Sequence, residues 1–167
     1  MTGAIRRCTP ADHAAIESII NDAARKYKGA IPEDRWHEPY MPGDQLRAEI
    51  EAGVEFWGWD DGGELLGVMG IQDVKDVTLI RHAYVRTTLQ RSGVGSALIT
   101  AIVPKARHRL MVGTWAAAQW AIRFYERHGF RLVPSEEKDR LLDLYWTIPS
   151  RQRDTSVVLV HEGKTPS

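Results

Sequence analysis

The apolar residues in the first third of the chain repeat at helical spacing between two breaks. A short run from Ala4 to Cys8 predicts a strand, and Thr9 and Pro10, which follow it, favour a helix start. Prolines and glycines interrupt the pattern over residues 28–43, and a second helix is predicted from Asp44 to the glycine at position 53. The apolar face of the first helix consists of Ile16, Ile19, Ile20, Ala23 and Tyr27.

The middle of the chain carries the pattern of strands. Two runs, residues 54–60 and 65–71, flank the sequence Asp-Gly-Gly at 61–63, which is a strong signal for a β-hairpin. A third strand is predicted over residues 77–85 after a further turn. Helical spacing then returns over residues 94–102.

The last third of the chain repeats the alternation of strand and helix. Residues 110–115 read as a strand, and residues 118–128 as a helix that stops at a glycine. Short strands are predicted at 130–133 and 156–160. The intervening segment, residues 135–154, is charged and aromatic, without a clear period.

These elements predict an α+β fold. We expect one domain over residues 1–167, because about 100 to 200 residues is the usual size of a domain, with residues 161–167 as a frayed tail. The strands predict a mixed, mostly antiparallel sheet of about six or seven strands, flanked by about four helices.

The charge balance and the single cysteine limit the possible partners. Basic and acidic residues number 22 each, so the composition gives no reason to expect binding to nucleic acid or to a membrane. Cys8 alone can form no internal disulfide and no thiolate cluster, and we expect no metal site. No stretch approaches the roughly 18 apolar residues of a membrane span, and no signal peptide is recognisable. We therefore expect a cytoplasmic protein.

The turn between the third strand and the following helix has the features of a phosphate-binding loop. Its sequence, Gln90 to Gly95, contains two glycines, which let backbone N–H groups approach a ligand at a helix N-terminus. A dinucleotide fingerprint would need a third glycine where Leu98 stands. A P-loop is also excluded, because the only Gly-Lys-Thr lies at 163–165, with Val158 in place of the first glycine.

Two segments in this order resemble the GCN5-related N-acetyltransferase (GNAT) superfamily. The first is the loop of the form Q-x-x-G-x-G at 90–95, and the second is Ala-Ile-Arg-Phe-Tyr-Glu-Arg-His-Gly-Phe at 121–130. The resemblance implies acetyl-CoA as the donor, bound between two parallel strands that splay apart, here the strand that ends at Val85 and the strand Leu110 to Trp115. The residues that it assigns to the cofactor are Ala83, Tyr84, Val85, Gln90, Arg91, Ser92, Gly93, Val94, Gly95, Ser96, Phe124 and Arg127.

The chemistry of acetyl transfer needs a proton for the departing thiolate and a neutral amine. Tyr125 matches the catalytic tyrosine of the family and is the candidate proton donor, although it also belongs to the apolar helix face. Family members commonly carry a glutamate on the strand before the loop, but no carboxylate stands in residues 78–82 here. His82 is the candidate base, because imidazole titrates near neutral pH, unless strand alternation turns it away from the cleft.

The acceptor site is expected between residues 28–43 and 135–154, which in this family enclose the substrate. Trp36, Tyr40 and Trp146 are the candidate substrate-binding residues, since aromatic rings beside carboxylates suit an amine. These rings could equally cover core edges or form the contact of a homodimer. A small amine and a peptide amine both remain open as acceptors. A CoA-binding module without turnover, and transfer of another acyl group or to an oxygen acceptor, are the alternatives.

Overall fold

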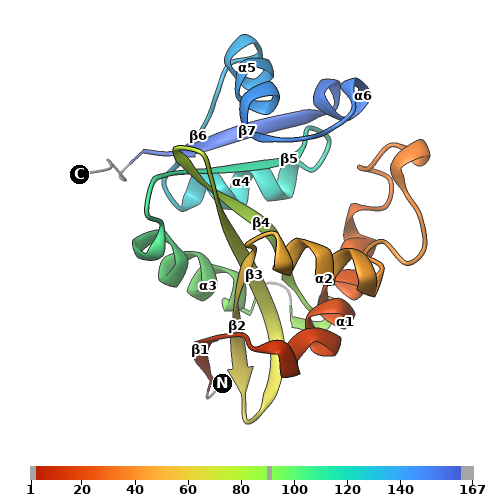
Figure 1. Cartoon of the computed structure of the whole chain (residues 1–167), viewed down its shortest axis with the longest axis vertical. Helices are drawn as coiled ribbons and strands as arrows, with labels where there is room; N and C mark the ends of the chain where they lie inside the picture. The colour runs from red at the N-terminus through yellow and green to blue at the C-terminus, as the bar shows by residue number, and fades with distance from the viewer. Residues whose placement is uncertain (1–2, 90–91, 163–167) are drawn as a thin grey trace.

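A computed structural model describes residues 3–89 and 92–162, and within them seven strands form one mixed sheet (Figure 1). The order across the sheet is β1-β2-β3-β4-β5-β7-β6, and only the β4–β5 pair is parallel. The strands are β1 (Ala4–Arg7), β2 (Glu55–Asp61), β3 (Glu64–Val74), β4 (Val77–Val85), β5 (Arg109–Trp115), β6 (Phe130–Leu132) and β7 (Ser156–His161). The predicted α+β fold with a mostly antiparallel sheet is confirmed.

Six α-helices flank the sheet in the described part of the chain. They are α1 (His13–Ala24), α2 (Gly43–Glu51), α3 (Val94–Ile102), α4 (Gln119–Arg127), α5 (Ser135–Tyr145) and α6 (Ser150–Asp154). The first four correspond to the predicted helices. The last two occupy residues 135–154, where the sequence pattern did not predict a helix.

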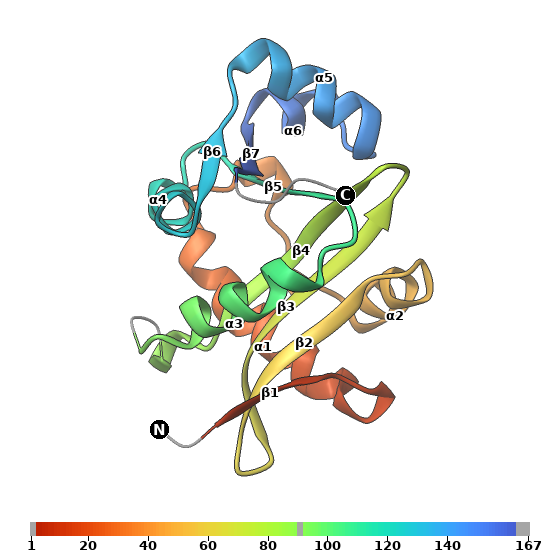
Figure 2. The same cartoon turned by 90° about the vertical axis from the view of Figure 1, so that its left-hand side faces the viewer.

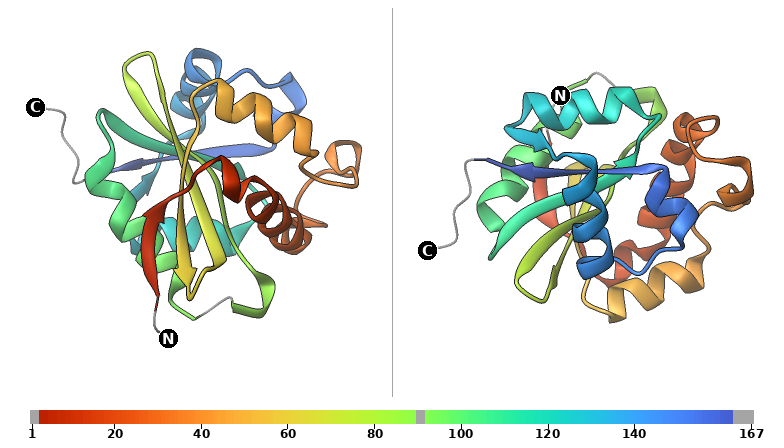
Figure 3. Two further views of the ribbon diagram at one scale, coloured as in Figure 1. Left: turned by 60° about the horizontal axis from the view of Figure 1, so that its bottom comes forward. Right: turned by 90° about the horizontal axis from the view of Figure 1, so that it is seen from above.

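The helices cover both faces of the sheet. Leu98 of α3 and Ile122 of α4 belong to one apolar cluster, whereas Ile19 of α1 and Leu46 of α2 belong to a second cluster with Phe56 of β2. A third cluster joins α5 to β5 and β7. Seen from above, α4 and α5 lie on opposite sides of β7 (Figure 3). The sheet is therefore sandwiched by helices along most of its width.

The β2–β3 hairpin and the C-terminal strand follow their local sequence. Gly62 and Gly63 have φ angles of 63° and 99°, which glycine adopts without strain, and the N–H of Gly63 donates to Asp60 Oδ1 at 2.6 Å. β7 continues to His161, which is paired with Phe130 of β6. Position 161, the predicted start of a frayed tail, thus belongs to β7, and residues 163–167 of that predicted tail lie outside the described residues.

Candidate functional site

The strands β4 and β5 separate in the middle of the sheet. Their parallel pairing runs from Val77 and Arg109 to Ile80 and Val112 and ends there. Beyond this point β4 remains paired with β3, while β5 remains paired with β7. Figure 2 shows the two ribbons diverging, with α3 and α4 on either side of the opening. The predicted splay of the parallel strands is confirmed.

A cavity of about 390 Å³ opens beside the splayed part of β4. Eight of the residues predicted to bind the cofactor line it: Ala83, Tyr84, Val85, Gly93, Gly95, Ser96, Phe124 and Arg127. They come from β4, from the start of α3 and from α4, so the two sequence motifs meet at one cavity. A volume of this size is typical of a site for a small molecule or cofactor.

The start of α3 forms part of the wall of this cavity, through Gly93, Gly95 and Ser96. Gly93 has a φ angle of 93° and precedes the first turn of the helix, whose N–H groups have no partners within the helix. Gly95 lies against Phe124, and a Cβ atom at Gly95 would approach that ring to 3.4 Å. The geometry suits an anion at a helix N-terminus.

The other described residues of the predicted loop are not among those that line this cavity. The side chain of Val94 is buried in the core beside Leu98, so only its backbone can serve a ligand. Ser92 is exposed, donates its hydroxyl to the carbonyl of Leu89, and is not part of the cavity wall. Gln90 and Arg91 lie outside the described residues.

Two cationic side chains that the sequence analysis did not assign also line this cavity of about 390 Å³. They are Lys26, just after α1, and Arg123 on α4, which join Arg127. The ammonium of Lys26 lies 5.3 Å from the centre of the Trp120 ring. No local pattern indicates Lys26, because its position at the cavity depends on how α1 packs against the sheet.

A second cavity, of about 190 Å³, lies on the other side of the splay. Tyr40 and Trp146, two of the candidate substrate-binding residues, line it together with Trp115 at the end of β5. The hydroxyl of Tyr40 is hydrogen-bonded to the side chains of Trp115 and Tyr84, and burial, first of all, raises its pKa. Tyr40 thus links the two separated strands across the gap.

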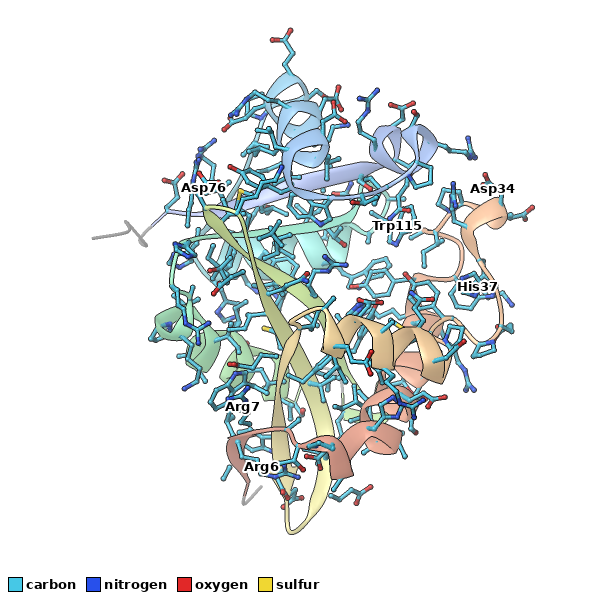
Figure 4. All side chains as sticks on the ribbon, in the orientation of Figure 1. Arg6, Arg7, Asp34, His37, Asp76 and Trp115 are labelled. Carbon is cyan, nitrogen blue, oxygen red and sulfur yellow. The ribbon has the colours of Figure 1, made fainter. Side chains whose placement is uncertain are left out.

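Trp36 is not part of the wall of either cavity and differs from the expectation in this respect. Its ring stacks on Tyr40 with 5.6 Å between centroids, and its indole N–H donates to Glu38 at 3.1 Å. Trp36 directly follows the short helical turn Glu33–Arg35 in this loop. Figure 4 shows Asp34 and His37 at the outer edge of this loop, whereas Trp115 lies inside it.

None of the described carboxylates of the two enclosing segments lines the second cavity. Asp34 pairs with Arg151 at 2.8 Å, and Asp143 pairs with Arg153 at 3.0 Å. None of the described residues that line this cavity is acidic, and its basic side chains are Arg81 and His82. The expected combination of aromatic rings with carboxylates is therefore not found there.

The two cavities meet at four shared residues: Tyr27, Ala83, Tyr84 and Tyr125. Burial raises the pKa of Tyr125, and the nearby Tyr27 adds a smaller effect. The pKa of Tyr27 is raised to about 12, mainly by burial. These phenols stay protonated at neutral pH and can donate hydrogen bonds at the junction.

His82 faces the second cavity because the β4 strand contains a bulge. Val68 pairs with Tyr84 and Gly70 with Arg81, so two residues of β4 lie opposite one residue of β3. His82, one of the two, has a φ angle of 58°. The irregular backbone breaks the strand alternation that would have turned the imidazole away, and His82 lines the cavity.

A carboxylate missed in the sequence reaches His82 from another element. Oε1 of Glu49, on α2, lies 2.5 Å from Nε2 of His82 and 3.7 Å from Nη2 of Arg81. Burial raises the pKa of Glu49, but its hydrogen bond to His82 and the neighbouring charges outweigh that effect, so the pKa lies below its usual value. Glu49 is ionised at neutral pH and orients the imidazole.

The sequence motif and the two-cavity geometry agree with a direct comparison with known families. The model of the acetyltransferase (GNAT) family matches residues 13–130 of the chain. The chain belongs to this family. It is therefore an acyltransferase, as predicted.

Individual acetyltransferases resemble the chain over most of its length. The peptidyl-lysine N-acetyltransferase YiaC of Escherichia coli (strain K12) is 27% identical over 133 residues, covering 72% of this chain and 88% of the relative. A GNAT-family acetyltransferase of Staphylococcus aureus Mu50 shares the fold with a TM-score of 0.71 at 13% identity, covering 98% of this chain and 100% of that one. The PaiA N-acetyltransferase of Thermoplasma acidophilum, solved in complex with coenzyme A, gives a TM-score of 0.69 at 11% identity, covering 97% and 99%.

Two further observations concern membranes and metals. No helix in the described part of the chain is both long and apolar enough to cross a membrane. Within residues 3–89 and 92–162, the structure brings together no group of three or more His, Cys, Asp or Glu side chains that could hold a metal ion.

Proposed function

We propose that this protein is an acetyl-CoA-dependent N-acetyltransferase that moves the acetyl group directly to a primary amine. The observation that carries the proposal is the meeting of two cavities at Tyr125. One cavity has the helix N-terminus and the cations that suit a CoA pyrophosphate, and the other is aromatic. A donor and an acceptor bound in them would face each other at the junction.

The proposed donor is supported by residues and by a neighbour of the same fold. Lys26, Arg123 and Arg127 supply positive charge beside the start of α3, as a ligand with several phosphates requires. β4 leaves β5 after Ile80, and beyond that point Ala83 and Val85 line the cavity along which an extended pantetheine arm would lie. The PaiA structure contains coenzyme A, and its fold covers nearly the whole of this chain.

Tyr125 is the proposed acid of the reaction. The amine attacks the thioester carbonyl, a C–N bond forms, and the C–S bond breaks to release the CoA thiolate. A phenol held at the junction donates its proton to this thiolate, whose ordinary pKa lies near 8.5. Its raised pKa keeps Tyr125 protonated until that step.

The aromatic wall and the charge of the second cavity favour an acceptor with one amine. Tyr40, Trp115 and Trp146 offer ring faces to an apolar or aromatic body, and they also attract a cation weakly. Because no described residue of the wall is acidic, a second ammonium group would find no counter-ion there. A lysine side chain satisfies these conditions, and the relative YiaC is a peptidyl-lysine acetyltransferase.

The test is a screen of acetyl-CoA with named amines, monitored by release of free thiol and by the mass of the product. The panel contains 2-phenylethylamine, spermidine, a peptide with a free N-terminal alanine, and an N-terminally blocked peptide with one lysine. We expect product with at least one single-amine acceptor and little with spermidine.

The matched control is the Tyr125→Phe variant, which should bind acetyl-CoA and release thiol slowly. Acetyl-CoA binding without product from any panel amine would instead support a sensing module. Faster turnover with a longer acyl-CoA, or with an alcohol acceptor, would overturn the assignment of donor or acceptor.

A further inference from the structure

We propose that Glu49 and His82 form a catalytic dyad, in which His82 is the general base for the acceptor amine and Glu49 is its positioning residue. This inference rests on the proposed function and deepens it at the same site. The strand before the cofactor loop has no carboxylate over residues 78–82 that could serve as the base. The carboxylate comes from helix α2 instead.

The backbone of β4 is arranged so that His82 can serve the cavity. A residue other than glycine with a φ angle of 58° is uncommon, and here it coincides with the strand bulge and with the cavity wall. Strain of this kind persists where the surrounding structure holds it in place, and it clusters at functional sites. The ring of Phe56 stacks beside the imidazole with 6.2 Å between centroids.

The bond to Glu49 fixes which nitrogen of His82 is available. Since Nε2 lies 2.5 Å from Oε1 of Glu49, Nε2 carries the proton in the neutral imidazole and donates it to the ionised carboxylate. Nδ1 is then the nitrogen with a free lone pair. The side chains of both residues are mostly buried, with 16% and 18% of their surface exposed, so the interaction is only partly screened by solvent.

The charged and polar groups around the pair come from β4, from α2 and from the loop before α2. Arg81 of β4 lies 3.7 Å from Glu49, and the hydroxyl-bearing rings of Tyr84 and Tyr40 lie near the imidazole or the carboxylate. The amide of Gln45, one turn earlier on α2, donates to Glu49 Oε2 at 3.2 Å. Arg81 opposes the effect of Glu49 on His82, but the carboxylate is closer and directly bonded.

The dyad completes the movement of protons in the transfer. The amine loses its surplus proton to solvent on binding, and as the C–N bond forms, Nδ1 of His82 takes the next proton from the amine nitrogen. The imidazolium is stabilised by the Glu49 carboxylate. Tyr125 protonates the CoA thiolate when the C–S bond breaks, and the proton on His82 returns through solvent to the tyrosine, so both side chains end as they began.

The first experiment measures the coupling without any acceptor. The Cε1–H signal of His82, assigned by its loss in His82→Asn, is titrated by NMR in the wild type and in Glu49→Gln. Removal of the negative charge should move the midpoint to lower pH by about 1 unit. Glu51→Gln, an exposed carboxylate at the end of the same helix, is the matched control and should leave the midpoint unchanged.

The second experiment measures the role in catalysis with whichever panel amine reacts with the wild type. His82→Asn suits the test because asparagine tolerates a positive φ angle. We expect kcat/KM to fall about 100-fold in His82→Asn and about tenfold in Glu49→Gln, with acetyl-CoA affinity unchanged. In Glu49→Gln the acidic limb of the pH–rate profile should move to lower pH, which a loss of folded protein cannot produce.

The outcomes separate this inference from the proposed function. If the wild type acetylates no panel amine, the proposed function fails, while the NMR titration still decides whether Glu49 controls His82. If the wild type is active but His82→Asn retains its rate, or the midpoint and the acidic limb stay in place in Glu49→Gln, the dyad is overturned and the acetyltransferase remains.

Discussion

At the scale of single residues, the hydroxyl of Tyr125 has the most specific proposed task. Its ring is buried against Phe124 and Phe130, so replacement by phenylalanine keeps the packing and removes one oxygen. We expect Tyr125→Phe to lower kcat about 100-fold or more and to leave the dissociation constant of acetyl-CoA nearly unchanged. Steady-state kinetics and calorimetric titration measure the two quantities.

The control for this prediction is Tyr145→Phe, which removes a phenol hydroxyl that is bonded to Asp76 on the surface, away from both cavities. Its turnover should equal that of the wild type. A Tyr125→Phe enzyme with normal kcat would show that water or another group protonates the thiolate.

Asp12 is expected to make the stability of the protein depend on pH. Arg6 binds its carboxylate through both oxygens at 2.8 and 2.9 Å and, with the N–H of Thr9, holds the pKa of Asp12 at about 2. Because this pKa is lowered by folding, the stabilisation is present above about pH 4, the usual pKa of the residue, and is lost as the pH falls through 2.

Asp12→Asn should therefore reduce the free energy of unfolding by about 1 kcal/mol at pH 7, and the difference from wild type should shrink between pH 4 and pH 2. Urea unfolding followed by fluorescence measures it. Glu64→Gln, an exposed carboxylate in the β2–β3 hairpin, should show no such convergence. A constant difference at all pH values would assign the effect to packing instead.

At the scale of elements, the bulge in β4 depends on a glycine in the neighbouring strand. A Cβ atom at Gly70 would lie 2.8 Å from the carbonyl oxygen of Arg81 and 2.9 Å from Val54. The backbone oxygen cannot move without disturbing the pairing that sets His82 in place. Gly70→Ala should therefore destabilise the protein by about 2 kcal/mol and reduce turnover in the fraction that folds.

The matched control is Gly43→Ala at the start of α2, where the added atom would meet the far end of the flexible Glu17 side chain at 2.8 Å. Its thermal midpoint should stay close to that of the wild type. If Gly70→Ala unfolds at the same temperature as Gly43→Ala, the bulge tolerates more movement than its geometry indicates.

The elements that the sequence predicted are those with strong local signals. The hairpin at residues 61–63 and the helix Val94–Ile102 have turn glycines or a regular apolar face, and they form where predicted. α5 was missed because its pattern is obscured by Lys138, which reads as a surface residue. The structure buries this lysine, whose ammonium donates to the carbonyl of Arg153 in α6 at 3.0 Å. That contact depends on tertiary packing.

At the scale of the whole molecule, the candidate site also divides into residues with local sequence signals and residues placed only by tertiary packing. Gly93, Gly95 and Tyr125 belong to local motifs and were predicted from sequence. Glu49 could not be predicted, because its partner His82 is 33 residues away and no spacing rule joins α2 to a bulge in β4. The bulge also explains why the alternation of side chains along a strand, which holds for regular strands, could not predict the direction of His82.

The arrangement of two cavities around one junction also predicts the kinetic mechanism. Donor and acceptor would be bound together before transfer, so initial-rate plots at several concentrations of each should intersect, whereas a covalent acetyl-enzyme would give parallel lines. The only cysteine does not support the covalent route. Cys8 lines neither cavity, and burial raises the pKa of its thiol to about 11, so it is not a thiolate at neutral pH.

Cys8→Ala should accordingly keep the kcat/KM of the wild type, with a small loss of stability because the sulfur packs against the core around α1. Mass spectrometry after incubation with acetyl-CoA alone should find no acetylated Cys8. Parallel initial-rate lines together with an inactive Cys8→Ala variant would reverse the conclusion, since the thiol would then have to reach the junction through a rearrangement of β1 and β2.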